Sequence, residues 1–302
     1  MIEARLHDGS RIGVEVRGQG PTVVMPVNPV PVEGPRADEM RAWGVDPALG
    51  RNLVDGLSEA FRVVAFDYEG HVLAEPKPDT LTPASIAADV LAVADAVGAE
   101  RFAYYGYSWL ALSGLQLAIR TDRLSALVMG GFPPVGGPYD EMLRVTMATH
   151  AMAVAGPGDQ PTAEPRDVEG TGEDTDWSTV EVRMTEAQTR QFVTLYTSLR
   201  GFDDRSVQAR ISCPRLCFAG SADVIDYDER WGGVRVDIAG PLLDWRDELE
   251  SLGWDVEVLD GLDHTLAMQP PSVLPILRPW LSSATAGVTE AVRRPGPDRA
   301  EG

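Results

Sequence analysis

One serine of the sequence stands where a nucleophile could be activated. Ser108 follows an apolar, β-prone run, residues 101–105, and precedes an Ala/Leu-rich run, residues 111–119, whose apolar residues recur at helical spacing. A strand that turns directly into a helix strains the corner residue, so small neighbours such as Gly106 are needed. The corner exposes the hydroxyl beside the unsatisfied N–H groups of the helix, whose positive dipole end stabilises an oxyanion. The pattern therefore indicates a nucleophile, although a serine that only caps a helix would occupy the same place.

This corner resembles the nucleophile elbow of the α/β-hydrolase family, which reads small-x-Ser-x-small between the central strand and a helix. The sequence there is Tyr104-Tyr105-Gly106-Tyr107-Ser108-Trp109-Leu110-Ala111. Leu110 stands where the family usually has glycine, and Ala111 can provide the small contact instead. The resemblance covers most of residues 10–132 and 210–283. It implies that the Trp109 N–H receives the oxyanion. We expect Trp109, Tyr107 and Met40 to shape an apolar pocket at the serine.

The resemblance extends to an acid and a histidine, each just beyond the end of an apolar run. Asp223 matches the family's Gly-x-x-Asp acid, and His264 matches the catalytic histidine in the loop after the last strand. The chain order Ser108, Asp223, His264 is that of the family. It implies that neutral His264 removes the serine proton while Asp223 holds the imidazole and stabilises its cation. Asp226 and Asp263 remain alternative acids.

The second oxyanion donor is less clear. In the family it is a backbone N–H just after a His-Gly pair at the end of an early strand, where this chain has Val27-Asn28 followed by Pro29. Proline has no N–H to donate. Either the register shifts by one residue, or the Asn28 side-chain amide substitutes, or acyl-transfer chemistry is impaired. A residue such as Asn28 could also do no more than cap the loop.

Strand and helix signals alternate along the chain and supply the elements that must position these residues. Residues 2–18 alternate apolar and polar around Asp8-Gly9, which predicts an antiparallel edge hairpin. Thr82, Pro83 and Gly98 bound a helix. The alternation predicts an α/β fold with a mostly parallel, doubly wound sheet. Further strands are expected at residues 22–25, 62–68, 101–105, 124–129, 215–220 and 255–259, and further helices at 49–60, 111–119, 241–253 and from the His264 loop to about 283.

The alternation breaks between residues 133 and 205. Two amphipathic helices are expected there, at residues 139–155 and 185–199, separated by residues 156–177, which are rich in Gly, Pro and acids and are expected to be mobile. Inserted into the sheet domain, they would form a helical lid. The expected division is a core at residues 1–132 and 206–283, a lid at 133–205 and a disordered tail at 284–302.

Composition disfavours several classes of partner. A formal charge of −20 and a pI near 4.5 would repel nucleic-acid phosphates and anionic membrane surfaces. The N-terminus carries charges where a signal peptide would be apolar, so a cytoplasmic protein is expected. A monomer or a homodimer is expected as its assembly state. Cys213 and Cys217 should be free thiols, and the sequence predicts no metal site and no cofactor. His71, in a turn at residues 67–71 that resembles the family's Asp-x-Arg-Gly-His pattern, and His150 are expected to be structural.

These observations favour a hydrolase of a small or medium ester, thioester or lactone that forms an acyl-enzyme on Ser108. Pro29 and Leu110 favour a second hypothesis, which is an enzyme of the same fold that does not cleave esters, such as a lyase, a C–C bond hydrolase or a cyclase, or a ligand-binding protein with an impaired oxyanion hole. A third hypothesis, a purely structural or interaction protein, would make the order of serine, acid and histidine a coincidence. Both enzyme hypotheses imply a small-molecule substrate.

Overall fold

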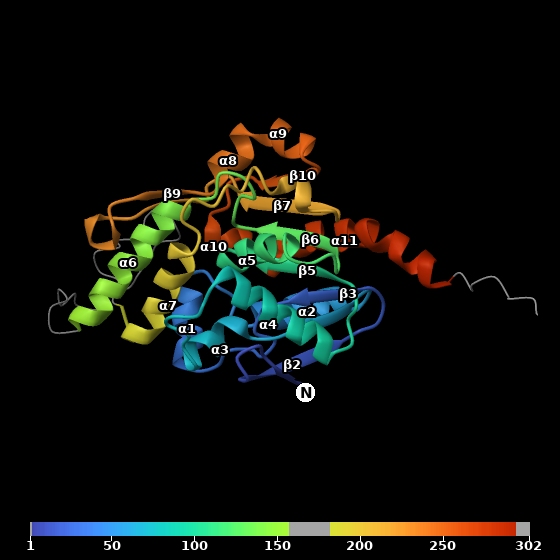
Figure 1. Ribbon diagram of the computed structural model, residues 1–302, viewed down its shortest axis with the longest axis horizontal. Coiled ribbons are helices and arrows are strands. Elements are labelled where there is room, and N and C mark those ends of the chain that lie inside the picture. The colour runs from blue at the N-terminus through green and yellow to red at the C-terminus, as the bar shows by residue number, and fades with distance from the viewer. Residues whose placement is uncertain (1, 157–181, 294–302) are drawn as a thin grey trace, which may run out of the picture.

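A computed structural model describes residues 2–156 and 182–293 of the chain (Figure 1). Its strands are β1 (Ile2–Arg5), β2 (Arg11–Arg17), β3 (Thr22–Met25), β4 (Arg62–Ala65), β5 (Phe102–Tyr107), β6 (Leu124–Gly130), β7 (Arg215–Gly220), β8 (Val224–Asp226), β9 (Arg235–Asp237) and β10 (Trp254–Leu259). Eight of them form one sheet in the order β1-β2-β4-β3-β5-β6-β7-β10. Neighbours are parallel from β4 to β10 in that order, and the β1–β2 and β2–β4 pairs are antiparallel. The predicted edge hairpin and the mostly parallel, doubly wound sheet are confirmed.

The central strands are apolar throughout because both of their faces are covered. In β3, Val24 belongs to one hydrophobic cluster, whereas Val23 and Met25 belong to the other, and none of the three has exposed surface. Successive side chains of a strand point to opposite faces of the sheet, so a continuous apolar run fills two cores at once.

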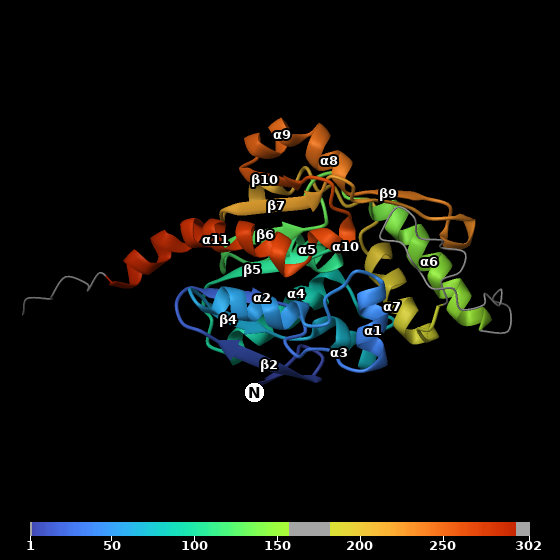
Figure 2. The ribbon, with the colours of Figure 1, turned by 180° about the vertical axis from the view of Figure 1, so that it is seen from behind.

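Helices cover the two faces of the sheet, as the opposite views in Figures 1 and 2 show. Helices α4 (Pro83–Ala96) and α5 (Trp109–Ala118) contribute to one core, and α2 (Leu49–Ser58) and α11 (Pro270–Arg293) contribute to the other. Helix α4 begins where the sequence predicts. The Thr82 hydroxyl accepts a hydrogen bond from the Ser85 N–H, and the Ser85 hydroxyl accepts one from the Thr82 N–H, which is a capping box.

The last helix, α11, runs beyond its predicted end. The expectation of a disordered tail from residue 284 is wrong as far as Arg293, the last residue of the helix. Ala284 packs against the core, and the buried Thr285 hydroxyl donates to the Leu281 carbonyl. Leu277, Leu281, Ala284 and Thr285 lie at helical spacings of three and four residues. The sequence prediction ended the helix too early because it gave more weight to the Arg, Pro and Gly residues that come later in the chain. Residues 294–302 lie outside the described part of the chain.

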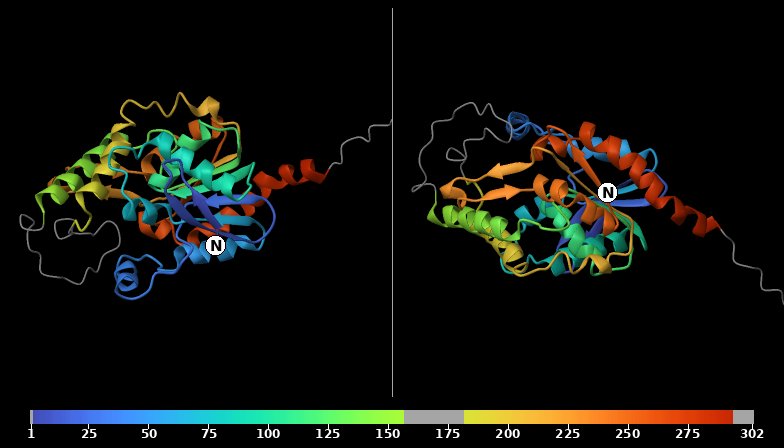
Figure 3. Two further views of the ribbon diagram at one scale, coloured as in Figure 1. Left: turned by 60° about the horizontal axis from the view of Figure 1, so that its bottom comes forward. Right: turned by 90° about the horizontal axis from the view of Figure 1, so that it is seen from above.

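Two helices of the insertion, α6 (Tyr139–Ala155) and α7 (Glu186–Thr197), lie side by side at one end of the sheet (Figures 1 and 3). Their bounds match the sequence prediction to within two residues. His150 Nδ1 lies 3.0 Å from the Thr189 hydroxyl, and this contact joins the two helices. The segment at 156–177 that was expected to be mobile lies, from residue 157 onward, outside the described residues.

The segment after β7 differs from its prediction. Strands β8 and β9 pair as an antiparallel hairpin, which the sequence analysis did not predict. The single helix predicted at 241–253 is instead two short helices, α8 (Ala239–Asp244) and α9 (Arg246–Ser251). They meet at Trp245, whose φ of −116° and ψ of 23° are not helical and whose ring packs over Gly136. The remaining α-helices are α1 (Pro35–Ala42), α3 (Tyr68–Ala74) and α10 (His264–Ala267).

No helix among the described residues combines the length and the apolar character that crossing a membrane requires.

Candidate active site

Ser108 occupies a strained corner between β5 and α5. Its φ of 57° and ψ of −130° make it the one described non-glycine residue with a positive φ, and such a conformation costs on the order of 1–3 kcal/mol. The Ser108 N–H donates to the Gly130 carbonyl at 2.8 Å, which ties the corner to the neighbouring strand. A Cβ at Gly106 would overlap the Leu110 carbonyl oxygen. The sharp turn therefore depends on that glycine, as the sequence indicated.

The N-terminus of α5 offers free donors beside the serine. The Ser108 carbonyl accepts from the Ala111 and Leu112 N–H groups at 2.8 and 3.2 Å. The Trp109 N–H, at the first helical position, has no intrahelical partner, because the first N–H groups of a helix never do. A negative charge developing next to Ser108 would meet this N–H and the positive end of the helix dipole.

Asp223 and His264 meet at the carboxyl end of the sheet. His264 Nδ1 lies 3.0 and 2.9 Å from the two carboxylate oxygens of Asp223, whose side chain has no exposed surface. The two alternative acids have other partners. Asp263 accepts from the Leu266 N–H and caps α10, and Asp226 pairs with Arg235 at the surface. Asp223 is therefore the acid that contacts the histidine ring.

This arrangement favours the protonated form of His264. Burial by itself would lower the pKa of the ring, but the charge and hydrogen bond of Asp223, with a further contribution from Asp263, raise it above its ordinary value of 6.5. A base with a raised pKa is a stronger proton acceptor, provided that the pH leaves it neutral.

Tyr107 holds the loop that carries the histidine. Its hydroxyl donates to the His264 carbonyl at 2.7 Å, and the centroids of the two rings are 5.1 Å apart. A Cβ at Gly130 or Gly131 would clash with the Tyr107 ring, so the two glycines leave room for it. The sequence placed Tyr107 in the substrate pocket. In the structure Tyr107 lines the wall of a cavity, and its hydroxyl also holds the His264 backbone.

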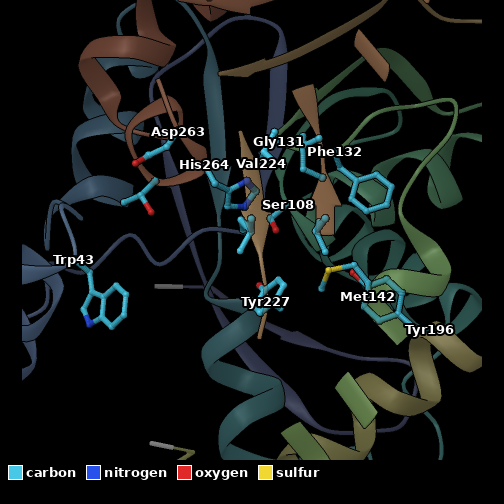
Figure 4. Close-up of a pocket in the computed structure, with 14 residues that line it drawn as sticks. Trp43, Ser108, Gly131, Phe132, Met142, Tyr196, Val224, Tyr227, Asp263 and His264 are labelled. Carbon is cyan, nitrogen blue, oxygen red and sulfur yellow. The ribbon is translucent and has the colours of Figure 1, made fainter. Parts of the chain in front are cut away.

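Ser108 and His264 lie together on the walls of two cavities. The smaller has a volume of about 320 Å³ and is mostly apolar (Figure 4). Phe132, Met142 of α6 and Tyr196 of α7 close one side of it, and side chains of the β8–β9 hairpin and its flanks close another. Those flanking and hairpin residues are Val224, Ile225, Tyr227, Val236 and Ile238. Sequence reasoning missed this wall, although apolar residues at alternate positions after Asp223 were a signal for it.

The larger cavity has a volume of about 500 Å³ and also reaches Ser108 and His264. Trp109, Met40 and Asn28, three residues that the sequence assigned to substrate or oxyanion binding, line it together with Tyr107. The structure therefore brings all the sequence-predicted site residues to one region. Met40 belongs to α1, whose C-cap residue, Trp43, lines the smaller cavity and not the larger one.

Asn28 is held in place beside this cavity. Its side-chain oxygen accepts from the Val30 N–H at 2.9 Å, and a Cβ at Gly50 would overlap its carbonyl oxygen. The side-chain oxygen of Asn28 therefore accepts a hydrogen bond within its own loop. The side-chain amide nitrogen makes no hydrogen bond with a described residue. Both readings of Asn28 from the sequence, loop cap and amide donor, are compatible with this geometry, since one side chain can do both.

The other histidines and the cysteines have structural contacts. His71 Nε2 lies 3.1 Å from the Ser10 hydroxyl, and His150 joins α6 to α7. Cys213 and Cys217 are free, and Cys217 is buried. Within residues 2–156 and 182–293, no cluster of three or more His, Cys, Asp or Glu side chains has the geometry to hold a metal ion.

Solved structures resemble this architecture over nearly the whole chain. A carboxylesterase from Nitrososphaera gargenis matches with a TM-score of 0.61 and 16% identity, covering 95% of this chain and 100% of that one. The chain has the α/β-hydrolase fold. The enol-lactonase from Burkholderia xenovorans LB400 matches with a TM-score of 0.52 and 19% identity over 97% and 100% of the two chains. An epoxide hydrolase from Vigna radiata gives 0.54 and 15% over 95% and 97%.

At these identities the likeness concerns the fold, and the α/β-hydrolase fold serves many chemistries. No family model matches the sequence, and no curated protein sequence matches it either. What the protein does must therefore be argued from its own site.

Proposed function

We propose that this protein is a serine-dependent hydrolase that cleaves a small or medium carboxylic ester, thioester or lactone through an acyl-enzyme on Ser108. The observation that carries the proposal is the Asp223–His264 contact at 2.9 Å beside a serine in a strained corner, with both Ser108 and His264 on the same two cavities. A pocket that holds a nucleophile and a base oriented by an acid is the arrangement that acyl transfer needs.

In the proposed reaction, neutral His264 takes the Ser108 proton as Oγ attacks the substrate carbonyl. The new C–O bond places negative charge on the carbonyl oxygen, which the Trp109 N–H and the α5 dipole stabilise. His264 then returns the proton to the departing oxygen or sulfur, leaving Ser108 acylated. Water attacks the acyl-enzyme with His264 again as base and frees the acid product. Asp223 keeps the imidazole oriented throughout.

Helices α6 and α7 act in this proposal as a lid over the smaller cavity. Met142 and Tyr196 supply part of its apolar wall. Excluding water there strengthens the electrostatic interactions of the transition state. The smaller cavity would therefore take an apolar part of the substrate.

One observation favours a second candidate function. Pro29 has no N–H, so the backbone position expected to complete the oxyanion hole offers no donor. Loss of one oxyanion donor lowers kcat by about 10²–10³ in acyl transfer. An enzyme of this fold that does not cleave esters, or a binding protein, would tolerate that loss. The Asn28 amide, unpaired with any described residue and lining the same cavity, supports the hydrolase instead.

Labelling with a fluorophosphonate tests the proposal. We expect a covalent adduct on Ser108, located by mass spectrometry, that forms much more slowly in the His264→Ala protein and is absent from Ser108→Ala. An adduct would be followed by a panel of ester, thioester and lactone substrates. An unlabelled Ser108 in a folded protein would contradict the hydrolase and favour the second candidate.

A further inference from the structure

The larger cavity carries charged side chains that the proposed acyl transfer does not use. Its wall includes Arg36, Asp46, Asp67 and Glu69 as well as Ser108 and His264. The smaller cavity is walled mainly by apolar side chains. A substrate held at Ser108 would thus meet apolar surface on one side and charge on the other.

The charged side chains of this wall differ in how well they are paired. Asp46 accepts hydrogen bonds from the Ala48 N–H at 2.8 Å and from the Asn52 side chain at 2.7 Å. Asp67 caps α3 by accepting from the Gly70 N–H at 2.8 Å. Glu69, in contrast, forms neither a hydrogen bond nor an ion pair with any residue of the described ranges.

Arg36 does not neutralise Glu69. The guanidinium forms no ion pair within 4.0 Å among the described residues, although it lies close enough to affect Glu69 electrostatically. The Glu69 side chain is exposed and lines the cavity, so its carboxylate is open to water and to a bound ligand.

A carboxylate in this condition gains more from a cation than a well-paired one does. Such a cation would offset the repulsion between the Glu69 and Asp67 carboxylates. Tyr107 and Trp109, both half-buried, belong to the same wall, and aromatic rings attract ammonium groups. The net charge of −20 further favours the approach of cations over that of anions.

We propose that the larger cavity binds a positively charged, ammonium-type group of the substrate and that Glu69 is the residue that selects it. This inference rests on the proposed ester hydrolysis and adds the class of ester: one with an amino or quaternary ammonium group in the part that enters the larger cavity. Asp67 contributes its charge while it caps α3. Tyr107 and Trp109 contribute their rings.

Matched pairs of esters that differ only in charge test the inference. Acetylcholine and its uncharged isostere 3,3-dimethylbutyl acetate place the charge on the alcohol side of the ester. The p-nitrophenyl esters of trimethylglycine and of 3,3-dimethylbutanoic acid place it on the acyl side. We expect kcat/KM for the cationic ester to exceed that for the uncharged ester by about tenfold or more in one of the two pairs. This ratio corresponds to the usual strength of an interaction with a charged group.

Two variants then locate the preference. Glu69→Gln should abolish the preference, measured as the ratio of kcat/KM for the two members of a pair, and Glu69→Lys should reverse it. Glu39→Gln removes the same charge from α1, but Glu39 pairs with Arg183 outside both cavities, so this control should keep the preference. Equal kcat/KM for both members of both pairs, or a preference that survives Glu69→Gln, would overturn the inference.

Failure of the proposed hydrolysis would be recognised separately. If neither uncharged ester is hydrolysed, calorimetric titration with butyltrimethylammonium, compared with 3,3-dimethylbutanol, still measures the cation site. Binding of the cation alone, lost in Glu69→Gln, would support the site without the reaction. Equal or absent binding of the two probes would refute it.

Discussion

Removing the Tyr107 hydroxyl tests whether this residue positions the catalytic base. Tyr107→Phe deletes one hydrogen bond, from the hydroxyl to the His264 carbonyl at 2.7 Å, and leaves the ring in place. A hydrogen bond of this kind is worth about 0.5–1.5 kcal/mol, so the loss of stability should be small. Displacing a catalytic group by about 1 Å can cost 10²-fold in rate. We therefore expect kcat for an ester to fall about tenfold or more, with little change in KM.

The chain contains a matched control for this experiment. The Tyr104 hydroxyl donates to the Leu110 carbonyl at 2.9 Å and is buried on the opposite face of the same strand. Tyr104→Phe therefore removes a comparable hydrogen bond without touching the histidine loop. Both variants should lose similar stability in urea unfolding, and Tyr107→Phe alone should lose most of its activity.

The pH profile separates positioning from a change in basicity. The Tyr107 hydroxyl contacts the backbone of His264 and not its ring. The acid limb of kcat/KM should therefore keep its midpoint in Tyr107→Phe while its height falls. Equal activity of the Tyr107→Phe and Tyr104→Phe proteins would refute the reasoning, and so would a shifted midpoint at unchanged maximal rate.

Three further outcomes follow from single contacts. Catalysis needs neutral His264, whose pKa is raised above 6.5, so kcat/KM should rise with pH through a midpoint above 6.5. Asp263→Asn removes a negative charge near the ring but can still cap α10, so it should move this midpoint to lower pH. Lys77→Met should cost about 1–3 kcal/mol in urea unfolding, because Asp89, with no exposed surface, loses the cation at 3.1 Å but keeps hydrogen bonds from Tyr68 and His7; an unchanged stability would contradict this. Gly50→Ala should displace Asn28 and lower kcat for esters at least tenfold with the fold retained, whereas unchanged kcat would exclude an oxyanion role for that loop.

The fold and the position of the candidate nucleophile could be predicted because their signals are local. The buried runs of the parallel strands and the corner at Ser108 depend on residues that are neighbours in sequence. Asp223 and His264 are 41 residues apart, yet both follow a strand of one parallel sheet. Their meeting therefore follows from topology and needs no detail of packing.

The cavity walls could not be predicted in the same way. The smaller cavity combines Met142 and Tyr196 with Val224 and Val236, which come from three separate segments. Whether side chains from such segments line the same cavity depends on how elements that are distant in the sequence pack against each other. The break of the predicted helix at Trp245 has the same origin, since its ring packs against Gly136, more than one hundred residues earlier.

The turn at residues 67–71 shows why a motif match is not enough to assign a role. It fits the family pattern at Asp67, Gly70 and His71, and all three have structural contacts: Asp67 caps α3 through Gly70, and His71 contacts Ser10. The pattern has arginine where this chain has Glu69. Arginine at this position would add a positive charge to the wall of the larger cavity, where Glu69 adds a negative one. In the proposed cation site the residue that departs from the pattern determines the substrate, whereas the residues that match the pattern maintain the turn.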